Sequence, residues 1–258
     1  MNHTFAICAY KESPYLEACI QSVLAQREDS QVILCTSTPN QLIEGLATKY
    51  GLSLHINNAP SSIHGDWNFA LSMAKGEYVT LCHQDDIYEP GYCDAVKKAV
   101  QKGFLVFFSD YWELRGKNKC SGGKLLLIKR MLLSPLRVKA FQGLRWAKRF
   151  ALRFGCGICC PSVTFHMPSM PKPLFQAGFK SDLDWQAWEK LSTQRGRFAY
   201  EPRRLMCHRI HEESETSRII GENQRGKEDY QMFLKFWPPF IAKMLTRFYS
   251  ASEKSNSL

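Results

Sequence analysis

The residues of this chain that could do chemistry gather in three short stretches. Their sequences are His83-Gln-Asp85-Asp86, Asp182-Leu-Asp184-Trp185 and Cys207-His208-Arg209-Ile-His211. Asp85 and Asp86 directly follow an apolar, strand-like run, and carboxylates at the end of a strand are suited to holding a divalent cation against a phosphorylated ligand. The alternative is that these two acids only cap a helix that begins near Glu89.

Strand-like and helical patterns alternate over the first 110 residues. Short apolar runs predict strands at Thr4–Ala9, Gln31–Cys35, Leu52–Asn57, Tyr78–Cys82 and Phe104–Ser109. Apolar residues at helical spacing predict helices over Pro14–Gln26, Pro39–Tyr50, Ile63–Ala74 and Gly91–Gln101. This alternation predicts βαβ units and a mostly parallel sheet, whose ligands bind beyond the carboxyl ends of the strands. We therefore expect the turns after the first, second and fourth strands to meet at one crevice.

Length and composition indicate a globular protein. The 258 residues are 45% hydrophobic, which allows a sizeable core in one large domain or in a domain with a tail. No run of eighteen apolar residues occurs, and Phe5–Ala9 follows the first residues without a signal-peptide pattern, so we expect a cytoplasmic protein. Most of the ten cysteines lie in apolar patterns, which favours reduced core thiols over a disulfide framework.

The net charge of +10 originates in one segment. Between Glu113 and Asp182 there are fourteen Lys and Arg residues and no acid. Its core, residues 125–133 and 141–154, mixes basic and apolar residues at spacings that predict amphipathic helices. The pattern suits an anionic membrane surface or a lipid-phosphate acceptor. A groove for nucleic acid and an ordinary solvated basic face are the alternatives.

The last part of the chain, from Glu228 to Tyr249, is aromatic and basic. Pro238 and Pro239 divide it into two predicted short amphipathic helices. Such helices either pack on the preceding domain or lie in a membrane interface.

Several segments together resemble the family 2 glycosyltransferases, which have the GT-A fold. The segment Ala9–Gln26 resembles the opening of that family, Gly65–Val79 resembles its Asn-containing helix and the strand that follows, and His83–Asp86 falls at its D-x-D-like signature. The resemblance covers residues 4 to about 110, and with the motifs around Asp184 and His211 it reaches about residue 218.

This resemblance implies a site for a nucleotide diphosphate sugar, a UDP-sugar first among them, and a divalent cation. Asp85, Asp86 and His211 are the implied ligands of Mn²⁺ or Mg²⁺. The implied nucleotide-binding residues are Ala9, Tyr10, Glu12, Thr36, Ser37, Asn68 and Asp85.

The resemblance also implies an acceptor side. An inverting transfer needs a carboxylate within hydrogen-bond reach of the acceptor hydroxyl. Asp184 is the expected general base, Asp182 the reserve candidate, and Trp185 a platform for a sugar ring, while Arg209 and Ser214 would hold phosphate or acceptor. The alternative is that Asp182 and Asp184 only cap and stabilise the first turn of a helix.

Some positions depart from the family pattern. Thr36 and Ser37 replace a carboxylate that contacts the nucleoside in many relatives, and His83 replaces the first acid of the D-x-D element. Imidazole is a poor ligand for Mg²⁺ and a tolerable one for Mn²⁺, so the identity of the metal stays open. The C-x-x-C pair Cys156 and Cys159 lacks a second pair at zinc-finger spacing, so we expect a turn entering a buried strand there.

The sequence thus predicts a GT-A-like three-layer α/β/α domain over residues 1–224, with a mostly parallel central sheet. It carries a basic helical insertion at about 115–154, and a helical tail follows over 225–258. The predicted activity, of the bacterial surface-polysaccharide type, is inverting, metal-assisted transfer of a sugar to a hydroxyl of a cell-surface glycan, most simply a lipid-linked one, at the inner face of the cell membrane. A catalytically silent protein that binds a nucleotide sugar or an assembly partner is the main alternative. A nucleic-acid-binding protein would leave the acidic motifs unexplained.

Overall fold

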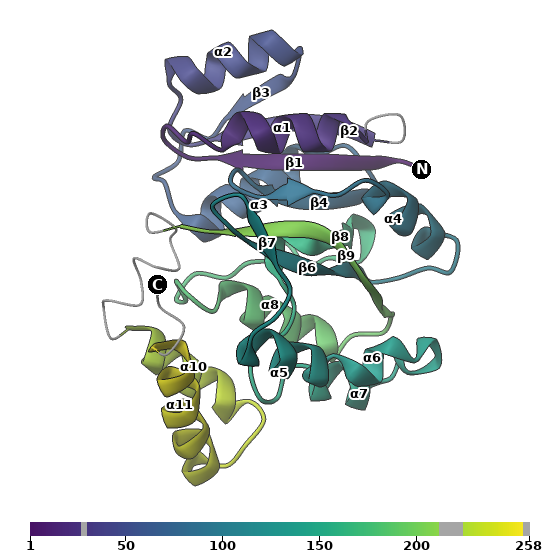
Figure 1. The fold of residues 1–258 in the computed structure, drawn as a ribbon, viewed down its shortest axis with the longest axis vertical. Helices are drawn as coiled ribbons and strands as arrows, with labels where there is room; N and C mark the ends of the chain where they lie inside the picture. The colour runs from purple at the N-terminus through teal and green to yellow at the C-terminus, as the bar shows by residue number, and fades with distance from the viewer. Residues whose placement is uncertain (27–29, 212–223, 255–258) are drawn as a thin grey trace.

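The computed structural model describes residues 1–26, 30–211 and 224–254, and a nine-stranded sheet organises them (Figure 1). The strands are β1 (His3–Ala9), β2 (Ser30–Thr36), β3 (Ser53–Ile56), β4 (Tyr78–His83), β5 (Ile87–Tyr88), β6 (Val106–Arg115), β7 (Asn118–Cys120), β8 (Val163–His166) and β9 (Phe198–Ile210). Their order is β3-β2-β1-β4-β8-β6-β9-β5, and β7 pairs with β6.

The sheet is mostly parallel, as predicted. β3, β2, β1 and β4 pair in parallel, and so do β6 and β9. Between these two groups lies β8, which is antiparallel to both β4 and β6, so that the two groups share one direction. The carboxyl ends of β1, β2, β4 and β9 consequently point toward the same edge of the sheet.

The helices also follow the predicted patterns over the first 110 residues. They are α1 (Leu16–Leu24), α2 (Gln41–Tyr50), α3 (Ile63–Met73) and α4 (Tyr92–Val100). Local capping explains two of these starts, because the side chain of Asn40 accepts the backbone N–H of Ile43 and that of Ser62 accepts the N–H of Gly65.

Helices cover both faces of the sheet and give the predicted three layers. Alternate residues of a strand point to opposite faces, so Phe5 and Ile7 pack with α1, α2 and α4, whereas Ala6 packs with α3 and the later helices. This arrangement confirms the predicted α/β/α architecture.

The basic insertion and the tail are helical, as predicted. The insertion holds α5 (Lys124–Leu132), α6 (Ser134–Arg137), the 3₁₀ turn η2 (Lys139–Phe141) and α7 (Arg145–Phe150). Two more 3₁₀ turns, η3 (Cys160–Ser162) and η4 (Met167–Ser169), flank β8, and α8 (Leu183–Ser192) precedes β9. The tail forms α10 (Gln224–Leu234) and α11 (Pro239–Lys254).

The tail packs on the domain. Met232, Phe233 and Ala242 are fully buried in the core cluster that also contains Trp185 and Trp188 of α8. The division of the chain near residue 224 stays a prediction, since this core spans it. All ten cysteines are free thiols, and no helix in the described ranges is both long and apolar enough to cross a bilayer.

Candidate active site

Asp85 and Asp86 lie in the short loop that joins β4 to β5. The next helix, α4, begins only at Tyr92 and has Gly91 at its N-cap. The helix-capping alternative for the two acids is therefore wrong. Asp86 is fully buried, whereas Asp85 is half-buried.

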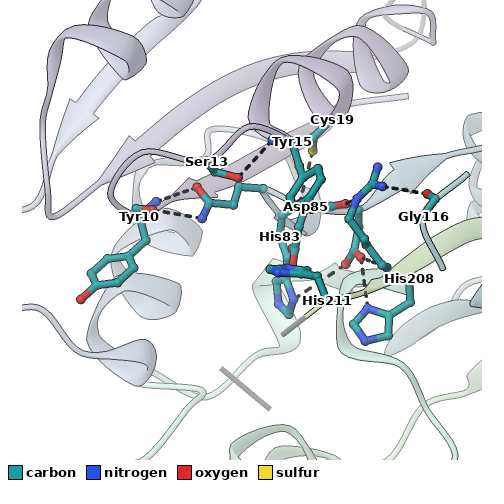
Figure 2. Close-up of polar contacts among 12 residues, drawn as sticks. Tyr10, Ser13, Tyr15, Cys19, His83, Asp85, Gly116, His208 and His211 are labelled. Atoms are coloured by element: carbon teal, nitrogen blue, oxygen red, sulfur yellow. Dashed lines mark hydrogen bonds and ion pairs between the residues drawn. The ribbon is translucent and has the colours of Figure 1, made fainter. Parts of the chain in front are cut away.

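Contacts from neighbouring elements fix this loop. The Cys19 thiol of α1 donates to the carbonyl oxygen of His83 at 3.3 Å. The side-chain amide of Gln84 bonds twice to the backbone of Tyr10, because its Oε1 accepts the N–H at 2.9 Å and its Nε2 donates to the carbonyl at 3.0 Å (Figure 2). The ends of β1 and β4 are thus held side by side.

The end of β9 supplies basic residues to the same loop. The Nδ1 atom of His208 lies 3.1 Å from Oδ1 of Asp86, and the backbone N–H of Arg209 donates to the same oxygen at 2.9 Å. The Nε2 atom of His211 lies 3.0 Å from Oδ2 of Asp85 (Figure 2). The structure therefore brings together the three residues predicted to bind metal, although 125 or more positions separate the acids from His211 in the chain.

Arg209 is held over this loop by several contacts. Its Nε donates to the carbonyl oxygen of Asp85 at 2.9 Å, and its NH1 lies 3.5 Å from the carbonyl of Gly116 in the β6–β7 turn. The guanidinium stacks 4.3 Å from the ring centroid of Tyr15. A fixed cation thus lies beside the acidic pair, where the sequence predicts a phosphate contact.

The donor atoms around the acidic loop fit a divalent cation. One ligand atom from each of His83, Asp85 and Asp86 lies within 4.8 Å of the others. Among the described residues, Nε2 of His83 and Oδ2 of Asp86 are buried and have no hydrogen-bond partner. Buried polar atoms are costly to leave unpaired, so these two atoms are suited to binding a metal ion.

The protonation of the histidines supports this fit. Burial lowers the pKa of His83 to about 4, so its imidazole is neutral near pH 7 and keeps a lone pair for a metal. The ring stacks on Trp67 with centroids 4.9 Å apart, which fixes its plane. Burial also lowers the pKa of His208, but the adjacent Asp86 carboxylate outweighs this effect, and the net shift is upward.

At the end of β2, one of the two hydroxyls predicted to contact the nucleoside is bonded to Asp66, an acid that the sequence analysis did not single out. The Ser37 hydroxyl donates to Oδ2 of Asp66 at 2.8 Å, and the Asn57 amide donates to Oδ1 at 2.8 Å. Ser61 adds a third donor at 3.2 Å. Asp66 belongs to the first turn of α3, and it therefore supplies a carboxylate where the turn after β2 lacks one. The buried Thr36 hydroxyl instead accepts the backbone N–H of Thr38.

The other predicted nucleotide residues are divided. Ala9, Tyr10 and Glu12 lie at the end of β1, at the same edge as the acidic loop. Asn68 lies on α3, and its amide is engaged with the backbone of the segment before α8. Its Oδ1 accepts the N–H groups of Leu174 and Phe175, and its Nδ2 donates to the carbonyl of Phe175 at 2.7 Å. Ser214 lies outside the described residues.

Asp184 lies in the first turn of α8, beside the Gly155–Cys160 turn. Its Oδ1 accepts the backbone N–H of Trp185 at 2.7 Å, and its Oδ2 lies 3.8 Å from the Cys156 thiol. Burial raises the pKa of this carboxyl, and the Trp185 N–H and the Lys129 charge offset the rise only in part. A half-buried carboxyl with a raised pKa is a reasonable candidate for a general base.

Trp185 does not have the predicted position at an acceptor. Its side chain is fully buried, its Nε1 donates to the carbonyl of Leu152 at 3.0 Å, and its ring packs edge-on against Phe233. The prediction that this ring stacks on a sugar is wrong for this conformation, because core packing covers both of its faces. The pattern Asp-Trp at a helix start does not distinguish the two situations.

Asp182, the reserve base, is buried at the N-terminus of α8 and makes no side-chain cap bond. Burial and the neighbouring Asp229 raise its pKa well above the usual range. The backbone amides of residues 180–182 are instead satisfied by the carboxylate of Glu228 on α10. The start of α8 is thus fixed by the tail, and Asp184 is the better exposed of the two candidates.

Lys129 of α5 is a second residue that the sequence analysis missed. It donates to the hydroxyl of Tyr111 at 3.2 Å. Its positive charge offsets part of the rise in the pKa of Asp184 and of His208. Burial, followed by the charges of Asp86 and Asp184, raises the pKa of the Cys159 thiol. The charges of both carboxyls thus act on the same thiol.

Comparison with known proteins identifies the family of one segment of the chain. Residues 4–127 match the family model described as glycosyl transferase family 2. This segment belongs to glycosyltransferase family 2. The match confirms the resemblance that the sequence motifs carry, and with it the predicted enzyme class. No curated protein matches the chain.

Solved structures confirm the GT-A fold. The alignment with S. aureus TarS, residues 1–349, covers the whole of this chain and 73% of the TarS chain, at 11% identity and a TM-score of 0.64. A second similar structure is the mannosyltransferase PcManGT from Pyrobaculum calidifontis in complex with GDP-Man and Mn²⁺. The alignment covers the whole of this chain and 76% of the PcManGT chain, at 16% identity and a TM-score of 0.63. A third is glucosyl-3-phosphoglycerate synthase from Mycobacterium tuberculosis in complex with UDP. The alignment covers 90% of this chain and 79% of the synthase chain, at 15% identity and a TM-score of 0.54.

Proposed function

We propose that this protein transfers a sugar, with inversion, from a nucleotide diphosphate sugar to a hydroxyl of a glycan acceptor. The observation that supports this best is the cluster in which Asp85 and Asp86 meet His83, His208 and His211 at the carboxyl edge of the sheet. An acidic pair ringed by imidazoles fits the demands of a metal–diphosphate site better than those of a structural ion pair, because Oδ2 of Asp86 and Nε2 of His83 are buried without a hydrogen-bond partner among the described residues.

On the donor side, Asp85, Asp86 and His211 would hold Mn²⁺ or Mg²⁺. His83 would stand beside them, where the D-x-D element of many relatives has its first acid. When bound, the cation supplies positive charge beside the departing diphosphate. Arg209 adds a fixed positive charge that its contacts with Asp85 and Gly116 hold in place. Preorganised charge of this kind stabilises a leaving group without a cost in reorganisation.

The nucleoside would lie across the ends of β1 and β2. We expect Ala9, Tyr10, Glu12 and Thr36 to border it, with Ser37 presenting the Asp66 carboxylate to the base or ribose. TarS is solved with UDP-GlcNAc and the mycobacterial synthase with UDP, whereas the mannosyltransferase is solved with GDP-Man. We propose a UDP-sugar as the first donor to test.

On the acceptor side, Asp184 would take the proton from the attacking hydroxyl. Burial raises the pKa of this carboxyl, which strengthens it as a base once it is ionised. The acid-free insertion next to it suits an anionic acceptor, so we propose a glycan carried on a lipid phosphate at the inner face of the cell membrane.

The test is a screen of nucleoside diphosphates and their sugars with and without Mn²⁺. We expect one nucleoside diphosphate to raise the Tm more in the presence of Mn²⁺ than in its absence, because a ligand that binds the native state stabilises it. The matching nucleotide sugar should then release nucleoside diphosphate under multiple turnover. Stabilisation with no turnover on any donor or acceptor would favour the silent binding protein. No stabilisation by any of them would refute the donor site.

A further inference from the structure

Exposed apolar side chains are concentrated at one end of the molecule. Thirteen large apolar side chains are exposed among the described residues, and eleven of them lie within residues 127–154 and 234–248. These stretches form α5, α6, α7, α10 and α11, which lie together at the lower end of the view in Figure 1, opposite β3 and α2. Scattered exposed apolar residues are ordinary, but a concentration of this kind marks an interaction surface.

The helix α11 has two apolar faces. One face packs on the domain through the fully buried Ala242 and the half-buried Leu245 and Tyr249. The other carries three side chains spaced four residues apart, and these are 74%, 50% and 69% exposed at Phe240, Met244 and Phe248 respectively. Residues four apart lie above one another on a helix, so the three form one continuous stripe.

Two basic residues belong to the same stripe. Lys243 and Arg247 line a shallow open hollow together with Phe240, Met244 and Phe248. No acidic residue occurs between Leu234 and Ser252, nor in α5, α6 and α7, which lie at the same end of the molecule (Figure 1). Lys243 and Arg247 thus give the hollow a cationic border, and an anionic lipid surface is complementary to such a border.

We propose that this face, formed by Phe240, Lys243, Met244, Arg247 and Phe248, binds an anionic lipid bilayer. The aromatic and Met side chains insert at the level of the acyl chains, and Lys243 and Arg247 contact lipid phosphates. The exposed apolar residues of α5, among them Leu127 and Met131, extend the contact on the same end of the protein. The helix lies in the interface and does not cross it.

The face has a direct connection to the candidate active site. The Tyr249 ring on the buried side of α11 packs 5.9 Å from Trp185, the residue after Asp184. A bilayer bound to α11 would therefore lie one helix away from α8 and its carboxyl. The inference that the bilayer delivers a lipid-linked acceptor to Asp184 rests on the proposed function. The inference that α11 binds a bilayer does not.

The test is co-sedimentation of the full chain with vesicles of phosphatidylcholine alone or mixed with phosphatidylglycerol. We expect binding to the mixed vesicles that weakens with salt, and at least tenfold weaker binding of the variant F240S/M244S/F248S. The variant L42S/I56S removes the two exposed apolar side chains at the other end and should bind like the wild type. The variant K243Q/R247Q should lose the preference for phosphatidylglycerol.

Two controls separate the outcomes. Circular dichroism and Tm should show that F240S/M244S/F248S folds, and its release of nucleoside diphosphate with a water-soluble acceptor should equal that of the wild type. Wild-type protein that ignores the mixed vesicles, or a folded triple variant that binds them equally well, overturns the proposal. So does a wild-type dimer that the triple substitution converts to a monomer without any change in vesicle binding, since the face would then join two copies of the chain. Failure of turnover with intact vesicle binding would instead count against the proposed function alone.

Discussion

Replacing Asp184 by Asn tests the chemistry with little change to the fold. Oδ1 of Asp184 accepts the Trp185 N–H at 2.7 Å, and the amide oxygen of Asn can accept the same bond. The contact of Oδ2 with the Cys156 thiol is long, at 3.8 Å, so little is lost when NH₂ replaces it. We therefore expect the free energy of unfolding to change by no more than about 1 kcal/mol.

The effect on turnover should be far larger. Loss of a general base lowers kcat by about 10²- to 10⁴-fold, which corresponds to about 2.7–5.4 kcal/mol in the barrier. The KM for the donor should stay near the wild-type value, because none of the contacts in the acidic loop involves Asp184. D94N, which alters an exposed acid on α4, is the matched control and should leave kcat unchanged.

The assay is the initial rate of nucleoside diphosphate release at saturating donor and acceptor, followed over pH. A base must be ionised, and burial raises the pKa of Asp184, so wild-type kcat should fall on acidification with a midpoint above the usual range of an Asp. D184N should lack this acid limb. If D184N retained kcat within about threefold of the wild type, the assignment of the base would be refuted.

Three further substitutions test other parts of the site. K129M removes a charge that lowers the pKa of Asp184, so the acid limb of kcat should move to higher pH, whereas K129R should restore it; an unmoved limb would separate Lys129 from the base. H83D replaces imidazole by carboxylate, and titration calorimetry with the nucleoside diphosphate present should show the ratio of Mg²⁺ to Mn²⁺ affinity rising by about tenfold; an unchanged ratio would exclude a metal contact. D66N replaces the carboxylate that accepts the Ser37 hydroxyl by an amide. It should weaken nucleoside diphosphate binding by about tenfold or more and leave the metal affinity unchanged. A nucleoside diphosphate affinity equal to that of the wild type would exclude Asp66 from the pocket.

Local patterns predicted the scaffold well because its strands and helices follow short-range rules. The apolar runs of β1, β2 and β4 and the helical spacing between them need no knowledge of distant residues. The extent of β6 shows where this reasoning stops. The apolar pattern predicts that this strand ends at Ser109, but it continues to Arg115. Parallel pairing with β9 extends the strand through half-buried and polar residues, where the apolar pattern alone predicts a boundary.

The donor side of the site was predictable only as far as a motif could be matched. Asp85 and Asp86 stand next to a strand, and the resemblance added His211. Asp66 escaped because it lies on a helix and reaches the end of β2 only through the fold. The signal was available in hindsight, since an acid in the first turn of α3 follows a capping Ser62 and faces the hydroxyl-rich turn that lacks a carboxylate.

Lys129 shows why the basic insertion could be misjudged from the sequence. The amphipathic pattern of α5 classes all its lysines as surface residues, and Lys124 is exposed accordingly. Lys129 instead turns inward to Tyr111, at a place where its charge acts on His208 on the donor side and on Asp184 on the acceptor side. The insertion would therefore serve both proposals. One face of α5 exposes Leu127 and Met131, and the other carries Lys129, whose charge acts on both His208 and Asp184. The proposed lipid binding and the proposed chemistry would then depend on the same short helix.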